Sequence, residues 1–191
     1  MASISINTPA LLDFLIGLLN TPSPTGMTDN ALAYCELAFA PFGLPMHRTR
    51  KGALVIEWPG EAATAPRALT AHVDTLGGMV KDVKSNGRLK LTKIGGFAWN
   101  TVEGEGCTVF THGGQTVRGS LLVAKASSHI FGAETGDMKR DDDGVEVRLD
   151  ARTKTADETR ALGIGVGDFV AFDPRVESGP AGFLRSRHLD D

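Results

Sequence analysis

An excess of positive charge is missing from this sequence. Its 191 residues include 20 Lys and Arg against 23 Asp and Glu, so the formal net charge is −3 and the pI is about 5.9. Aromatic residues make up only 6% of the chain, and no basic patch contains them. Domains that bind nucleic acids usually carry a basic patch and a high pI. We therefore expect no nucleic-acid partner.

Cysteines and long apolar runs are also scarce. Cys35 and Cys107 lie far apart and neither belongs to a Cys-x-x-Cys pair, which favours reduced thiols over a disulfide. No apolar run approaches the roughly 20 residues of a membrane span. The N-terminus lacks the basic segment and cleavage site of a signal peptide. We expect a cytoplasmic protein with no membrane partner.

The remaining composition is that of an ordinary globular protein. Hydrophobic residues make up 41% of the chain and charged residues 23%, which is enough to build a core. The length allows one large domain or two small ones. The 23 glycines, together with the few aromatics, favour many turns and short strands over long helices.

Two helices followed by apolar strands open the chain. Helical patterns cover residues 8–20, where Thr8 is expected to be the cap of the first helix, and residues 28–40. Apolar strands are expected at 46–50, 53–58 and 68–72. This order predicts the start of an α/β domain with its site at the ends of the strands.

Hairpin signals dominate the middle of the chain. Asn86-Gly87 separates two alternating runs, and a second hairpin is expected to turn at residues 112–115. Residues 145–150 alternate cleanly, and Thr155 and Glu158 have the spacing of a capping box. Several short strands separated by turn residues predict a small barrel or sandwich.

These patterns divide the chain into three predicted segments. Residues 1–78 would form the N-terminal part of an α/β domain, and residues 79–175 an inserted domain resembling a β-barrel. Residues 176–191 would be a strand that returns to the first domain. The predicted fold class is therefore α/β, with an all-β insertion.

His72 and Asp74 are the candidate site residues. They follow the apolar strand predicted at 68–72, and alternate residues of an extended chain point to the same side. An imidazole can ligate a metal ion while a neighbouring carboxylate fixes its ring and its tautomer. By itself, a His-x-Asp sequence at a strand end is more often structural than metal-binding.

Other polar residues have simpler interpretations. We expect His112 to lie in an exposed hairpin turn, and His188 to be structural. His129 has no orienting partner nearby in sequence, which argues against a nucleophilic role beside its serines. The acidic run at 141–143 lacks the spacing of a calcium loop and is expected to be an exposed turn. Trp99 is expected in the core.

The segment from His72 to Gly77, the β-rich insertion and the ending Leu189-Asp190-Asp191 together resemble one family. It is the dinuclear-zinc aminopeptidases, which include the glutamyl and tetrahedral aminopeptidases (metallopeptidase family forty-two). The resemblance covers essentially the whole chain. A weaker resemblance indicates a bacterial subgroup linked to synthesis of the osmoprotectant N-acetylglutaminylglutamine amide.

The resemblance implies a role for each site residue. His72 would ligate one metal ion, Asp74 would be the catalytic carboxylate that orients His72, and Asp190 would bridge two metal ions. The ions would be two divalent cations, zinc first, with cobalt or manganese as alternatives. The substrate would be a peptide that loses its N-terminal residue, and the protein would be a homo-oligomer.

The sequence also departs from the family pattern. That pattern continues beyond the bridging Asp with a Glu-Glu pair, a further carboxylate and a second His, which residues 1–191 do not contain. We therefore expect an N-terminal portion of such an enzyme, inactive as given. Thr75 stands where the family often has Glu.

Two other interpretations stay open. One is a non-catalytic β module for self-association or small-ligand binding. The other is a related zinc carboxypeptidase, in which the insertion would be an α/β lid instead of an all-β domain.

Overall fold

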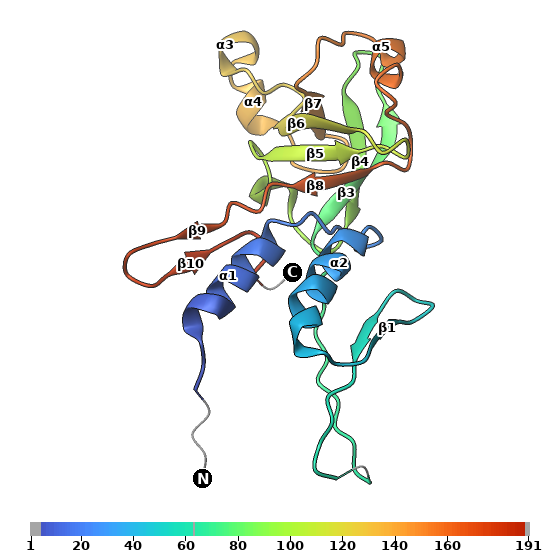
Figure 1. The fold of residues 1–191 in the computed structure, drawn as a ribbon. Helices are drawn as coiled ribbons and strands as arrows, with labels where there is room; N and C mark the ends of the chain where they lie inside the picture. Colours follow the sequence, from blue (N-terminus) through green and yellow to red (C-terminus); the bar gives the residue numbers. More distant parts are fainter. Residues whose placement is uncertain (1–4, 63, 190–191) are drawn as a thin grey trace. The chain divides into compact units, whose positions relative to one another are not determined.

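The computed structural model describes residues 5–62 and 64–189, and Figure 1 traces the chain. Two compact units are present. The first comprises the chain up to residue 74 together with residues from 174 onward, and the second comprises residues 75–173. Among the described residues, no helix is long and apolar enough to cross a bilayer.

Two helices dominate the first unit. They are α1 (Thr8–Leu19) and α2 (Asp29–Phe39), and a 3₁₀ turn, η1 (Ala40–Phe42), follows α2. The cap of α1 is Asn7, whose Oδ1 accepts a hydrogen bond of 3.2 Å from the Ala10 N–H. The predicted cap, Thr8, is therefore wrong by one residue, and Thr8 and Pro9 occupy the first helical positions.

The strands of the first unit are short. β1 (Met46–Arg48) pairs with β2 (Leu54–Ile56) as an antiparallel hairpin. The strand expected at 68–72 is wrong, because no described strand pairs with this segment. An apolar run becomes a strand only when a neighbouring backbone hydrogen-bonds to it, and that partner cannot be identified from the run itself.

The C-terminal part of the first unit forms a hairpin instead of the single return strand expected from residue 176. β9 (Glu177–Ser178) pairs antiparallel with β10 (Leu184–Arg185). Gly182, which has a φ of +81°, lies in the turn between them. The Gly-Pro-Ala-Gly sequence at 179–182 favours a turn and accounts for the difference.

The second unit is a closed barrel of six antiparallel strands. Their order around the barrel is β3-β4-β7-β6-β5-β8, so the last strand in sequence closes the barrel between the first and third. This confirms the fold prediction of mixed helices and strands with an all-β barrel. The strands are β3 (Gly77–Val83), β4 (Leu89–Ile94), β5 (Gly106–Phe110), β6 (Thr116–Val123), β7 (Val145–Leu149) and β8 (Phe169–Phe172).

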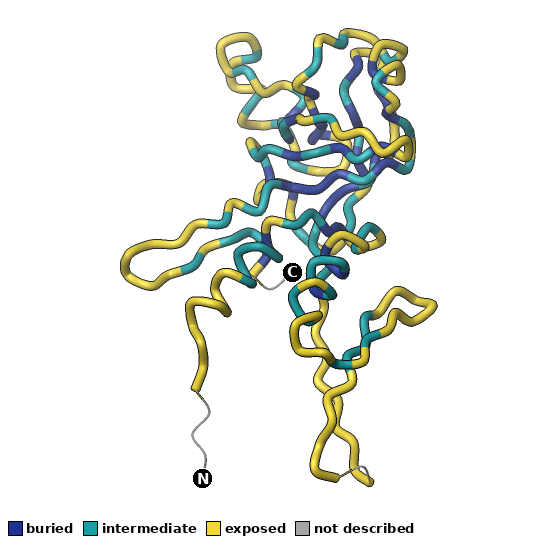
Figure 2. The backbone as a smooth tube through the Cα atoms, in the orientation of Figure 1, coloured by how far each residue is buried: buried dark blue, intermediate teal, exposed yellow. Residues whose placement is uncertain are grey.

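Apolar side chains from the strands form the core of the barrel unit. Figure 2 colours the buried residues of these strands dark blue. On β6, Leu121 is fully buried whereas its neighbour Leu122 is only partly buried. Trp99 is 2% exposed and packs edge-to-face on Phe97, which confirms its prediction as a core residue. Burial raises the pKa of the Cys107 thiol to about 12, so this thiol is unreactive at neutral pH.

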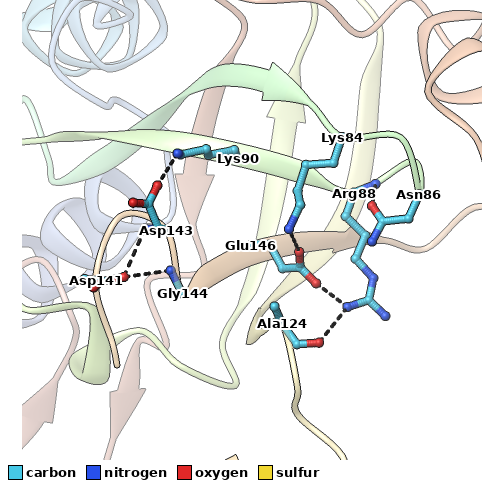
Figure 3. Close-up of polar contacts among 9 residues, drawn as sticks. All are labelled: Lys84, Asn86, Arg88, Lys90, Ala124, Asp141, Asp143, Gly144 and Glu146. Atoms are coloured by element: carbon cyan, nitrogen blue, oxygen red, sulfur yellow. Dashed lines mark hydrogen bonds and ion pairs between the residues drawn. The ribbon is translucent and has the colours of Figure 1, made fainter. Parts of the chain in front are cut away.

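A buried ion cluster lies where β4 meets β7. The two strands pair only at Leu89 and Val147 among the described residues, whereas β6 and β7 pair at five positions. Glu146 is 2% exposed and lies between the side chains of Lys84 and Arg88 (Figure 3). We call these three residues the barrel triad. Because strand pairing is sparse at this seam, the triad supplies polar contacts across it.

A short helix covers the turn between β3 and β4. In α5 (Ala156–Arg160), Thr155 and Glu158 form the predicted capping box. The buried Thr159 hydroxyl donates to the Gly87 carbonyl at 2.8 Å, which ties α5 to this turn. Two four-residue helices, α3 (Ser128–Phe131) and α4 (Glu134–Asp137), were not predicted. Both are too short to have a readable helical period.

Candidate functional site

His72 and Asp74 lie together in an extended loop. The His72 Nδ1 is 3.2 Å from the Asp74 Oδ1, so the two side chains face each other as their spacing predicted. A carboxylate beside Nδ1 favours the tautomer that carries its proton there and leaves Nε2 as the acceptor. The His72 side chain is 54% exposed, so solvent reaches the ring.

Two hydroxyl groups from the loop between α1 and α2 hold this segment. The Thr25 hydroxyl donates to the Asp74 Oδ2 at 2.6 Å, and the buried Ser23 hydroxyl donates to the Val73 carbonyl at 2.7 Å. Sequence reasoning did not assign either residue a role. The available signal was the loop's Pro-Ser-Pro-Thr-Gly sequence, in which prolines fix a conformation and hydroxyls can bond to another segment.

The contacts of Asp74 favour its ionised form. The Thr25 hydroxyl bond is the main cause that lowers the pKa of this carboxyl, and His72 lowers it further, against partial burial. A carboxyl whose pKa is lowered by folding contributes stability above its unfolded pKa, and this is lost as the pH falls through the lowered pKa. Asp74 is therefore a charged partner for His72 across the neutral range.

The described residues fit one metal ligand with a supporting carboxylate. The His72 ring is partly exposed and its Nδ1 faces Asp74, which leaves Nε2 as the nitrogen that could bind a metal ion. No group of three or more His, Cys, Asp or Glu side chains that could hold a metal occurs within 5–62 and 64–189. Asp190, the predicted bridging ligand, lies outside the described residues.

Three other histidines were considered from the sequence, and each has different surroundings. His112 is in the turn between β5 and β6 with a 75% exposed side chain, as predicted, but its Nδ1 lies 2.5 Å from Oδ1 of the buried Asp168. That pairing joins residues 56 positions apart and has no local signal. His129 lies exposed in α3, and His188 is 7% exposed, as a structural residue would be.

The acidic run at 141–143 is an exposed turn, as predicted. Two of its carboxylates bond to side chains of the barrel unit. Asp142 accepts a hydrogen bond of 2.6 Å from the Trp99 indole, and Asp143 pairs with Lys90. These contacts give the run a structural role.

The inserted unit helps to separate the related enzyme classes. A zinc carboxypeptidase would carry an α/β lid, whereas the unit from 75 to 173 is a closed barrel of β-strands with short helices at its surface. The barrel therefore favours the aminopeptidase interpretation over the carboxypeptidase one.

Comparisons with known proteins also indicate an aminopeptidase family. A sequence model described as M42 glutamyl aminopeptidase matches residues 52–191. The aminopeptidase candidate YhfE of Bacillus subtilis (strain 168) is 43% identical over 180 residues, which cover 94% of this chain and 52% of that protein.

Solved structures share the fold. The TET aminopeptidase of a marine sediment Thaumarchaeota archaeon superposes with a TM-score of 0.78 and 19% identity, over 93% of this chain and 48% of that one. The Pyrococcus horikoshii TET1 peptidase, which can assemble into a tetrahedron or a large octahedral shell, gives a TM-score of 0.74 and 17% identity over 95% and 52%.

The matches cover most of this chain but only part of its relatives. The chain spans about half the length of the relatives that it matches. The family match, in contrast, covers well over half of this chain and includes His72, Asp74 and the whole barrel. The chain therefore belongs to the M42 glutamyl aminopeptidase family.

Proposed function

We propose that this chain provides part of a metal-dependent aminopeptidase, which removes N-terminal residues from peptides at a dinuclear zinc site. The observation that carries the proposal is the chain of contacts from Thr25 through Asp74 to His72. Asp74 and His72 lie inside the segment matched to the family. Asp74 contacts the Nδ1 of His72 and orients the ring, which leaves Nε2 as the nitrogen that would bind a metal ion.

Each residue has a distinct part in this proposal. His72 would hold one ion through Nε2. Asp74 orients the ring, and Thr25 keeps Asp74 ionised and in place. Asp190 stays the predicted bridging ligand. Two bound divalent ions would lower the pKa of a water shared between them and polarise the scissile carbonyl.

The domain roles follow from the same proposal. Residues 1–78 and 176–191 would belong to the catalytic α/β domain, and residues 79–175 would be an insertion that shapes access and assembly. The relatives that assemble into shells support a homo-oligomer as the working form. A cytoplasmic location and the osmoprotectant subgroup stay predictions from the sequence. The general base and remaining ligands have no match in residues 1–191, so we expect no peptide hydrolysis by this chain alone.

Replacing Asp74 with Asn tests the site. The amide keeps the side-chain shape but removes the charge that orients His72, so we expect zinc to bind about 10- to 100-fold more weakly. Zinc affinity would be measured by competition with a chromophoric chelator. The matched control is Asp157→Asn, whose side chain is 96% exposed in the barrel unit. Equal zinc affinity in wild type and Asp74→Asn would contradict the proposal.

The runner-up is a non-catalytic β module for self-association or ligand binding, which the closed barrel would suit. The same titration separates the two. The proposed enzyme part binds zinc weakly at His72, whereas a pure binding module binds none.

A further inference from the structure

A cavity of about 670 Å³ lies in the barrel unit, between the turn that joins β3 to β4 and the loop that joins β7 to α5. Asn86 and Gly87 line it from the turn, and residues 151–154 line it from the loop. The hydrogen bond from the Thr159 hydroxyl of α5 to the Gly87 carbonyl holds the two walls together. A preformed cavity of this size has room for a small ligand.

The charged side chains that line this cavity are all basic. Among the described residues, four cations and no carboxylate line it, and we call these cations the basic cluster: Arg88, Arg148, Arg152 and Lys154. The cavity beside Trp99 differs, because three aspartates balance its two basic residues. The chain as a whole has a net charge of −3, so the basic cluster does not follow from composition.

Most of the basic cluster is unpaired. Three of its members are exposed and form no ion pair with any described carboxylate: Arg148, Arg152 and Lys154. Arg88 differs, because its Nη1 bonds to Glu146 and to the Ala124 carbonyl (Figure 3). Within 5–62 and 64–189, no contact uses its other two side-chain nitrogens. Like charges around one cavity repel one another, and a bound anion would relieve that repulsion.

The lining indicates which kind of anion fits. Guanidinium groups donate pairs of N–H groups to phosphate oxygens, and a cavity lined by one sign of charge concentrates ions of the opposite sign. The Asn86 amide and the Thr153 hydroxyl add neutral donors. No described residue in the lining is aromatic, so a nucleotide base would find no ring on which to stack. The lining therefore suits a compact phosphate compound.

We propose that the basic cluster binds a compact anion with two or more phosphate groups, of which inorganic pyrophosphate is the simplest. The cavity is much larger than one phosphate group and its cations come from both walls, which favours a ligand with at least two such groups. The site contains neither His72 nor Asp74, so it is independent of the proposed zinc site and of peptide hydrolysis.

The test is isothermal titration calorimetry of the full 191-residue chain with pyrophosphate. The buffer would contain a chelator and no divalent metal ions, so that the proposed zinc site does not contribute. We expect saturable binding of one pyrophosphate per chain, which weakens as the salt concentration rises. ADP carries the same diphosphate with a base attached and should bind with similar affinity. No saturable binding at millimolar pyrophosphate, or much tighter binding of ADP, would overturn the proposal.

Matched variants locate the binding site. Arg148→Gln and Arg152→Gln are each expected to weaken pyrophosphate binding about 10-fold, because each removes charge-assisted hydrogen bonds. Both side chains are exposed, so the barrel should still fold, which circular dichroism would check. The control is Arg160→Gln, which removes the same charge from a side chain that pairs with Asp157 and does not line the cavity. It should leave the affinity unchanged. Equal weakening by all three variants would show diffuse attraction and overturn the proposal.

Discussion

Replacing Glu146 with Gln is expected to lower the free energy of unfolding of the barrel by roughly 2–3 kcal/mol. Glu146 is 2% exposed and accepts charge-assisted hydrogen bonds from Lys84 and Arg88. An amide keeps the volume of the side chain but leaves the Lys84 ammonium and the Arg88 guanidinium without their carboxylate. Because both cations are about one-third exposed and can turn toward water, the loss is smaller than for a fully buried pair.

The measurement is urea unfolding followed by Trp99 fluorescence in a Trp58→Phe background. Trp99 is buried in the barrel, so its emission reports that unit. The control is Asp143→Asn at the same seam, where the carboxylate is 81% exposed and pairs with Lys90. Its loss should leave the free energy of unfolding nearly unchanged, because solvent screens an ion pair with so exposed a carboxylate. Equal losses in the two variants would show that the barrel triad has no special role.

A second large effect is expected for Leu121→Ala. Leu121 is 0% exposed inside the barrel and belongs to its core cluster, so truncation removes buried contacts and leaves a cavity. The expected loss is about 3–4 kcal/mol, read by the same unfolding assay.

Leu122→Ala is the matched control for the barrel interior. Leu122 follows Leu121 on β6 and points to the other side of the strand, where it is only partly buried. Its truncation should cost about 1 kcal/mol. A larger loss for Leu122→Ala than for Leu121→Ala would mean that the strand's inner and outer faces are wrongly assigned.

The parts of the fold that the sequence predicted depend on local signals. Asn86-Gly87 identified a hairpin because the turn itself requires those residues, and Gly87 has a φ of +79°. Thr155 and Glu158 identified a helix start because their side chains bond to backbone groups within four residues. Such contacts can be read without knowing the rest of the structure.

The parts that sequence reasoning missed depend on contacts between distant residues. Thr25 reaches Asp74 across 49 positions, and Lys84 reaches Glu146 across 62. Charged and hydroxyl side chains are common, so the partner of each cannot be predicted from the sequence of either segment. The error at 68–72 has the same origin, because a strand is defined by the neighbour that pairs with it.

The candidate site contains both local contacts and contacts between distant residues. The alternation rule placed His72 and Asp74 on one side of an extended chain, and their 3.2 Å contact agrees although the segment is not a paired strand. The hydroxyl groups of Ser23 and Thr25 that support the pair were visible only in the structure. The sequence therefore predicted that these two side chains share one side of the chain, and the structure shows which hydroxyl groups bond to this segment.

The proposed function depends on His72 as a ligand of a metal ion. Anomalous diffraction at the zinc absorption edge, from crystals of the zinc-bound chain, would locate the ion. We expect a zinc peak about 2.0–2.1 Å from the His72 Nε2, with Asp74 still on the Nδ1 side of the ring. Zinc peaks found only at other residues, with none beside His72, would contradict it.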